Sequence, residues 1–127
     1  AIRDELIVEG KWTPATGAAG VDMLRERQVS FSALVASNDD MAVGAIKQLH
    51  AHGVSVPQQV SVIGFDDIAL APYRIPALSS VRIPVTEMIK ETINRLIFML
   101  DGGDFKYQQT FPGELIERDS IVSGPHA

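Results

Sequence analysis

Several classes of protein are excluded by what this sequence lacks. It contains no cysteine among its 127 residues, so it has no disulfide framework and no thiolate metal site. No apolar stretch approaches the roughly 20 residues of a membrane span, and we expect no membrane partner. The first residues, AIRDELIVEG, show no charged-then-apolar leader. These absences are compatible with a cytoplasmic protein.

Positive charge is also sparse. The chain has 11 basic residues against 16 acidic ones, and its arginines and lysines are dispersed rather than clustered. Phosphate binding needs clustered Lys and Arg, so we expect no DNA binding by this segment itself. His50 and His52 come near the end of an expected helix and His126 lies in the tail, without metal-ligand spacing. We predict no metal, no cofactor and no catalytic residues.

One enzyme-like arrangement needs separate comment. Asp66–Asp67 after an expected strand resembles a phosphoacceptor, but such a site needs an acidic pair after the first strand and a lysine after a later one. Neither is present, and no glycine-rich turn with a lysine follows these strands to hold a phosphate. We therefore expect that the protein is not an enzyme.

Apolar patterns of strand length alternate along the chain with patterns of helix length. Continuous apolar runs predict strands at residues 5–10, 31–37, 60–65 and 80–84, with a late strand pair in 107–122 broken at Pro112–Gly113. Helices are predicted from the cap candidate Thr13, from residue 40 to the stop at Gly53, and from the cap candidate Thr86 to Gly102–Gly103. This alternation favours an α/β fold, a three-layer parallel sheet with helices on both faces.

Polar and aromatic residues follow the first three predicted strands. They are Lys11–Trp12, Asn38–Asp40 and Asp66–Asp67. Ligands bind beyond the carboxyl ends of the strands in an open parallel sheet, and right-handed crossovers bring these exits to one edge. The sequence therefore predicts a ligand site there.

The residue types at these exits suit a sugar. An indole such as that of Trp12 packs against the C–H face of a sugar ring, while Asn38 and Asp66 can hydrogen-bond its hydroxyl groups. Each residue also has a plainer interpretation. Asn38 can cap a helix, Asp66 can satisfy loop amides, and Trp12 can be a half-buried packing residue.

The motifs SNDDMAVGAI, GVSVPQQVSVIGFDDIALAPY, PALSSVRIP and LIERDSIVSGP together resemble the LacI/GalR family of bacterial transcription regulators, with the closest likeness to repressors of sugar or β-glucoside operons. The resemblance implies one lobe of a periplasmic-binding-protein-like type I fold. Residues 1–82 would form the C-terminal effector-binding lobe and 83–103 a crossover segment that packs on a missing N-terminal lobe. Residues 104–127 would return to the C-terminal lobe and end in the tail.

The resemblance also implies a function. A sugar bound between two lobes would alter DNA binding by a helix-turn-helix domain that this chain lacks, in a homodimeric, cytoplasmic repressor. Trp12, Asn38 and Asp66 fall where the family contacts its ligand, and Val43 and Tyr73 where it makes dimer contacts. Ile83 stands where several members have a polar residue, and the family's ligand-binding arginine is absent. The alternative is a solute-binding protein of a sugar transport system.

Without a first lobe, the last predicted helix has no partner. Its stripe of Ile89, Ile93, Leu96, Ile97 and Leu100 would face water, and exposed apolar area on that scale implies association. We therefore expect the chain to pair through this helix, and exchange of the helix between copies is one form of such pairing.

Overall fold

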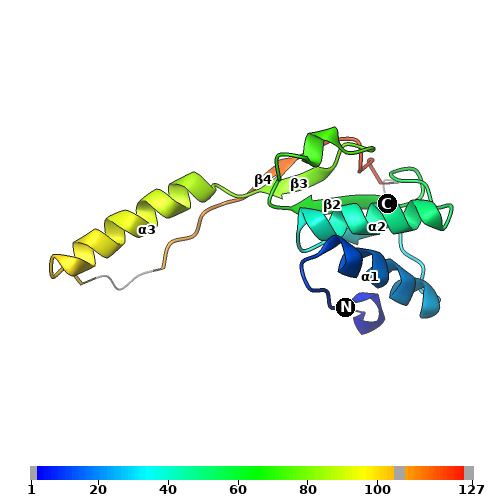
Figure 1. Ribbon diagram of the computed structural model, residues 1–127, viewed down its shortest axis with the longest axis horizontal. Helices are drawn as coiled ribbons and strands as arrows, with labels where there is room; N and C mark the ends of the chain where they lie inside the picture. The colour runs from blue at the N-terminus through cyan, green and yellow to red at the C-terminus, as the bar shows by residue number, and fades with distance from the viewer. Residues whose placement is uncertain (1–2, 105–107, 125–127) are drawn as a thin grey trace.

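The structure is a computed structural model that describes residues 3–104 and 108–124. Two short 3-10 helices, three α-helices and four strands are present in these ranges. In chain order they are η1 (Asp4–Leu6), α1 (Pro14–Glu26), β1 (Ala33–Val35), α2 (Asp39–Ala51), β2 (Ser61–Phe65), η2 (Ala71–Tyr73), β3 (Ser79–Arg82), α3 (Val85–Leu100) and β4 (Glu114–Ile116). Figure 1 shows a body of sheet and helices from which α3 projects.

The four strands form one mixed sheet in the order β1-β2-β3-β4. β1 runs parallel to β2 and β2 parallel to β3, as predicted. β4 pairs antiparallel with β3, with Ile116 opposite Ser80. Of the predicted late strand pair, the structure shows only this second strand. Residues 108–113 are not in a strand, and Tyr107 lies outside the described residues.

Helices α1 and α2 cross at contacts between their backbones. Thr13 caps α1 and Pro14 occupies its first turn, as the sequence predicts. A β-carbon at Gly44 would lie 1.8 Å from the Pro14 carbonyl oxygen, and one at Gly17 would lie 2.0 Å from the Met41 carbonyl oxygen. Glycine at both positions lets the two helices approach this closely, at some cost in helix propensity.

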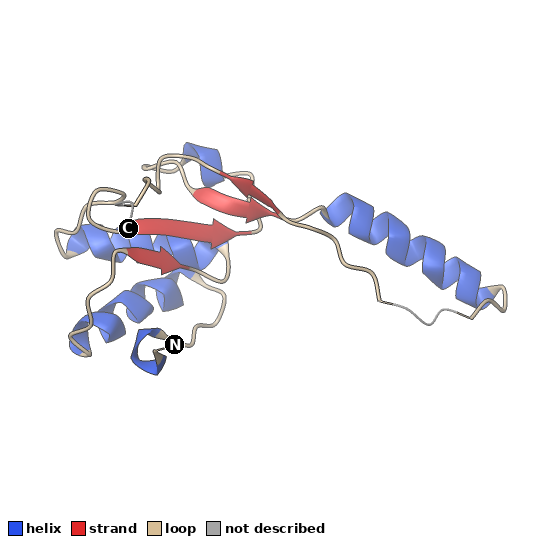
Figure 2. Ribbon diagram, turned by 180° about the vertical axis from the view of Figure 1, so that it is seen from behind, coloured by secondary structure: helices blue, strands red, loops and turns tan. Residues whose placement is uncertain are grey.

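The core lies between these helices and the sheet. Val21 of α1, Ala42 of α2, Val62 of β2 and Leu78 are each 0% exposed and belong to one apolar cluster. Figures 1 and 2 place α1 and α2 on the same side of the sheet. Val35, in the edge strand β1, is 80% exposed. The described residues therefore form only one of the two helical layers predicted, since α3 leaves the sheet instead of packing on it.

The strand predicted at residues 5–10 is not formed. Asp4–Leu6 is a 3-10 helix, and the chain then continues without a strand partner. Instead of a ladder, the carbonyl oxygens of Glu5 and Ile7 accept hydrogen bonds of 3.0 and 2.8 Å from Nη1 of Arg27. The strand prediction is wrong here, because a strand needs a neighbour to pair with as well as an apolar pattern. In the described part of the chain, β1 pairs only with β2.

Helix α3 is separated from the body and contains no buried residue. The predicted cap at Thr86 is wrong. The helix begins two residues earlier than that cap implies, at Val85 with Pro84 as the N-cap residue, and the Pro84 carbonyl oxygen accepts a bond from the Met88 amide. Ile93, Leu96 and Ile97 are each more than half exposed, as expected for a helix without its partner. No helix within residues 3–104 and 108–124 has the length and apolarity to cross a membrane.

Candidate functional site

Asn38 stands at the exit of β1 and caps α2. Its Oδ1 accepts a 2.9 Å bond from the Met41 amide, which satisfies one of the free N–H groups of the first turn. Its Nδ2 donates a 3.1 Å bond to the carbonyl oxygen of Trp12. One lone pair and one N–H of the carboxamide remain for another partner. Capping and ligand binding are therefore compatible at this residue.

Trp12 lies immediately before the capping residue of α1. Its φ of 61° places it in the left-handed region, which is unusual for a bulky residue. The Asn38 bond to its carbonyl oxygen supports this conformation. Its side chain is 65% exposed. Trp12 is therefore not a half-buried packing residue in this chain, and its indole is accessible from solvent.

Asp66 follows β2 in a strained turn. Its φ is 102° and that of Asp67 is 52°, conformations that L-residues rarely adopt. The Asp66 amide donates a 2.9 Å bond to the Val81 carbonyl oxygen. Its exposed carboxylate makes no hydrogen bond or ion pair with the described residues. The pKa of Asp66 is raised by partial loss of solvation and, secondarily, by the nearby charges of Asp39 and Asp40.

The turn is held in place by the carboxylate of Asp39, a role that was not predicted from the sequence. Asp39 is 0% exposed. Its Oδ1 accepts a 2.6 Å bond from the Ser80 hydroxyl, and its Oδ2 accepts a 2.8 Å bond from the Ile68 amide. Asp39 thus ties the start of α2 to β3 and to the chain just after Asp66. Its position beside Asn38 gave no sequence signal that would distinguish it from the exposed Asp40.

A second set of contacts fixes Asp67. Its Oδ2 accepts a 2.8 Å hydrogen bond from Nε of Arg82, its Oδ1 forms a 2.7 Å ion pair with Nη2 of Arg118, and its side chain is 5% exposed. Although burial favours the neutral form of Asp67, hydrogen bonds from Arg118 and Arg82 outweigh it and lower the pKa. Arg118, whose side chain is 15% exposed, is therefore not a solvated surface charge, whereas Arg82 pairs with Asp67 while 51% of its side chain stays exposed.

These contacts bring the three predicted ligand residues to one end of the sheet. Trp12 is bonded to Asn38, and the neighbouring Asp39 is bonded to the turn that carries Asp66. An exposed indole, a carboxamide with spare bonding capacity and an unpaired carboxylate can together recognise a polyol. Within the described ranges, no group of three or more His, Cys, Asp or Glu side chains could hold a metal ion.

The two residues predicted for dimer contacts meet on another surface. Val43 of α2 and Tyr73 of η2 line the same pocket, together with Ile46, His50 and Ile75. Tyr73 is 80% exposed and Ile75 is 92% exposed. This surface combines apolar and aromatic groups in a way that is common at protein interfaces.

Comparison with known proteins agrees with this architecture. The periplasmic binding protein-like domain family matches residues 3–121. The HTH-type transcriptional regulator AscG of Escherichia coli (strain K12) is 70% identical over 123 residues, which are 97% of this chain and 37% of AscG. The chain therefore spans just over a third of the length of this relative. This relative is a transcriptional regulator.

Two solved structures extend the comparison. A sugar-binding transcriptional regulator of the LacI family from Escherichia coli, complexed with phosphate, has a TM-score of 0.87 and 70% identity over 96% of this chain and 44% of its own. The lac repressor dimer bound to operator and the anti-inducer ONPF has a TM-score of 0.85 and 25% identity over 91% of this chain and 40% of its own.

The family match, the relatives and the α/β architecture agree with one another. This chain belongs to the periplasmic binding protein-like domain family, in the form that LacI/GalR transcriptional regulators use to bind effectors.

Proposed function

We propose that this chain is the C-terminal part of the effector-binding region of a sugar-responsive LacI-type repressor. The observation that carries the proposal is the unpaired, exposed carboxylate of Asp66, in a strained turn that Asp39, the neighbour of Asn38, ties to the start of α2. A strained conformation at an exposed polar residue is typical of a binding site. A solved structure that is 70% identical to this chain is described as a sugar-binding transcriptional regulator, which supports the same function.

The ligand site uses three side chains with different tasks. The Trp12 indole stacks on the C–H face of the sugar ring. The Asp66 carboxylate accepts bonds from two hydroxyl groups, and the spare N–H of Asn38 donates to a third oxygen. The effector occupies the cleft between this lobe and an N-terminal lobe that this chain does not contain.

Regulation follows from unequal affinity for two lobe arrangements. A sugar that binds the closed arrangement more tightly shifts the population towards it, and coupling of about 1–3 kcal/mol is typical between two such sites. The operator is bound by a helix-turn-helix domain outside this chain, in a cytoplasmic homodimer. The dimer forms through the surface of Val43 and Tyr73.

Two other functions are less well supported. A transport solute-binding protein shares the fold, but the matched relatives described above are transcriptional regulators. An enzyme would need a nucleophile or metal site, and the polar residues near Asp66 are instead engaged in holding the turn. We propose that the protein has no catalytic activity.

The test measures sugar binding by calorimetry in a chimera. The matched stretch of AscG is replaced by this chain, so that the cleft has both walls, and the chimera is titrated with cellobiose, salicin and other β-glucosides. Asp66→Asn removes a charge-assisted contact worth about 1.5–3 kcal/mol, so we expect Kd to rise roughly 10- to 100-fold. Asp40→Asn is the matched control, because it removes an exposed carboxylate one residue from Asp39.

Asn38→Ser separates capping from binding. Serine still caps the helix but lacks Nδ2, which bonds the Trp12 carbonyl oxygen and supplies the spare N–H. Affinity should therefore fall about 10-fold or more, while the melting temperature falls only by the loss of one exposed hydrogen bond, worth about 1 kcal/mol. If neither Asp66→Asn nor Asn38→Ser weakens the binding of a sugar that the chimera does bind, the assigned site is wrong. If no sugar of the panel binds, the effector class is wrong.

A further inference from the structure

The turn at residues 66–68 is bonded to the body at each of its three amides. The first amide donates a 2.9 Å bond to the Val81 carbonyl oxygen, the second a 3.0 Å bond to the Ser80 hydroxyl, and the third a 2.8 Å bond to the Asp39 carboxylate. The first two residues have φ values of 102° and 52°. Such conformations persist only where the surrounding contacts impose them, so these three bonds maintain the shape of the turn.

Ser80 connects two of these contacts. It is 0% exposed, so a ligand in the cleft cannot touch it. Its hydroxyl accepts the bond from the Asp67 amide and donates a 2.6 Å bond to Oδ1 of Asp39. A hydroxyl has only one hydrogen to donate, so both bonds have a fixed direction. Ser80 therefore links the backbone of the turn to the carboxylate at the start of α2.

The neighbouring strand leaves room for this carboxylate. Gly64 of β2 is opposite Ser80 in the register of the sheet, and a β-carbon there would lie 2.1 Å from Oδ1 of Asp39. Glycine inside a strand weakens the strand and often marks a close approach by another group. Here the approaching group is the buried side chain of Asp39.

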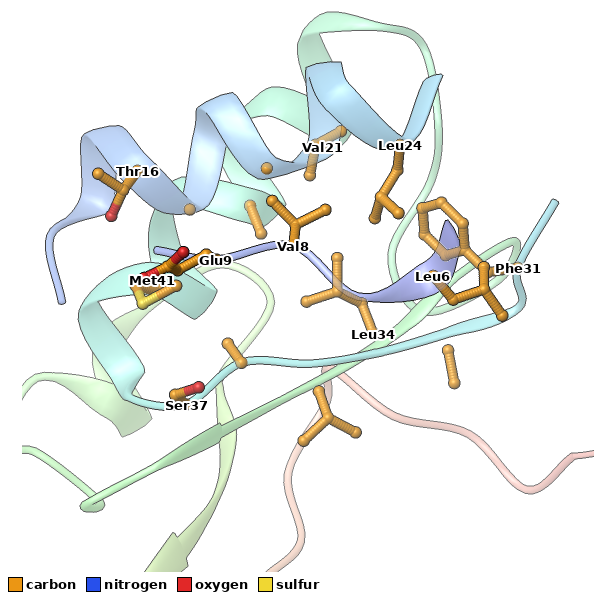
Figure 3. A pocket seen from close by; sticks show the side chains of 16 residues that line it. Leu6, Val8, Glu9, Thr16, Val21, Leu24, Phe31, Leu34, Ser37 and Met41 are labelled. Atoms are coloured by element: carbon orange, nitrogen blue, oxygen red, sulfur yellow. The ribbon is translucent and has the colours of Figure 1, made fainter. Parts of the chain in front are cut away.

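The start of α2, to which Asp39 belongs, is fixed against α1. Figure 3 shows Met41 between the start of α2 and α1, and a β-carbon at Gly17 of α1 would lie 2.0 Å from the Met41 carbonyl oxygen. Asn38 caps the same end of α2 and bonds the carbonyl oxygen of Trp12. Asp39 is therefore part of the same rigid unit as the other two predicted ligand residues.

We propose that Ser80 is a positioning residue for the effector, because its hydroxyl fixes the Asp66 carboxylate relative to Asn38 and Trp12. This inference rests on the proposed function, since it takes Asp66 as a ligand residue. Without the hydroxyl, the strained turn loses one of its three bonds and relaxes. The apparent affinity then falls with the fraction of molecules that keep the binding conformation.

The test compares Ser80→Ala with Ser79→Ala in the AscG chimera. Both serines are 0% exposed in β3, but the Ser79 hydroxyl accepts from the Arg118 amide at 2.8 Å. Each substitution leaves an amide without its acceptor, so both should lower the melting temperature. Calorimetry with cellobiose and salicin should show Kd raised roughly 5- to 30-fold by Ser80→Ala and changed less than about 2-fold by Ser79→Ala.

A double substitution shows whether Ser80 acts through Asp66. In an Asp66→Ala chimera, Ser80→Ala should raise Kd by less than about 2-fold further, because the carboxylate that it positions is already absent. An equal effect of Ser80→Ala with and without Asp66 would overturn the proposal, and so would an unchanged Kd in Ser80→Ala alone. If Asp66→Ala itself leaves sugar affinity unchanged, the proposed ligand site is wrong instead.

A measurement without ligand tests the same inference if neither sugar binds. In NMR spectra of this chain, the three-bond coupling between the amide and α hydrogens of Asp66 reports its φ. Ser80→Ala should change this coupling and Ser79→Ala should leave it as it is. An unchanged coupling in Ser80→Ala would overturn the proposal. Ser80→Cys keeps a weak donor and acceptor and should give a smaller change, and it replaces Ser80→Ala in each comparison if that variant does not fold.

Discussion

The body of the chain and helix α3 differ in where their apolar residues lie, although both follow the same spacing rule. α2 buries Ala42, Ala45 and Leu49 against the sheet. α3 has the more regular stripe, yet none of its residues is buried and Leu100 is 78% exposed. Apolar spacing therefore shows that a helix has a face to bury, and it does not show whether the partner belongs to the same segment. Substitutions should accordingly affect folding in the body and association in α3.

The largest expected effect is in the body, at Asp39. Asp39→Ala removes the carboxylate that accepts from Ser80 and Ile68 and leaves both donors unpaired in the interior. We expect a loss of about 3–5 kcal/mol in the free energy of unfolding, measured by urea denaturation. Asp40→Ala, one residue on and exposed, should cost less than about 1 kcal/mol. Similar losses from both substitutions would contradict the role assigned to Asp39.

An intermediate effect is expected where the body is held by ion pairs. The folded-state pKa of Asp67 is lowered below its usual value of 3.8, so its stabilising contribution is present above that pH and is lost as the pH falls through the folded-state pKa. Asp67→Asn should reduce the free energy of unfolding at pH 7 by about 1–2 kcal/mol and flatten its dependence on pH below 4.

The control for this prediction is Glu117→Gln. Glu117 is exposed beside Arg118 and makes no ion pair with the described residues, so its removal should leave the acid slope unchanged. Denaturation midpoints measured between pH 3 and pH 7 test both variants. An unchanged slope in Asp67→Asn would mean that other groups govern acid sensitivity.

The smallest effect on folding is expected in α3. Ile93→Asp is predicted to change the free energy of unfolding by less than about 0.5 kcal/mol, because the side chain is already 51% exposed. Light scattering should nevertheless show reduced association, since the charge interrupts the apolar stripe. Asn94→Asp adds the same charge away from the centre of the stripe and should leave association intact.

The same measurement separates the two association surfaces. If Tyr73→Glu abolishes association while Ile93→Asp does not, the chain pairs through the surface of Val43 and Tyr73. The reverse result supports pairing through α3. A chain that is a clean monomer at high concentration before any substitution would rule out both for this segment.

Much of the fold could be predicted because its signals are local. The cap at Thr13, the strand at Ser61–Phe65 and the stop at Gly53 each depend on a few neighbouring residues. The strand at residues 5–10 could not be predicted correctly, because strand formation depends on a pairing neighbour and not only on the local apolar pattern. The antiparallel direction of β4 was missed for the same reason.

The candidate site, like the fold, could be predicted only in part. The exits at Asn38 and Asp66 could be located from the ends of strands, and the structure brings them to one end of the sheet. The support beneath them could not, because Asp39 and Ser80 are 41 positions apart in the chain. Likewise, only the folded chain shows that Arg118 reaches Asp67.

The crossing of Gly44 over Pro14 has a consequence for motion. Since the two helices touch through main-chain atoms, no side chain at the crossing can change its rotamer to absorb a displacement. Trp12 and Asn38, which precede the two helices and are joined by a hydrogen bond, must therefore travel as one rigid block. Any rearrangement of the chain is then confined to the connections outside this block, such as the two residues between β3 and α3, Ile83 and Pro84.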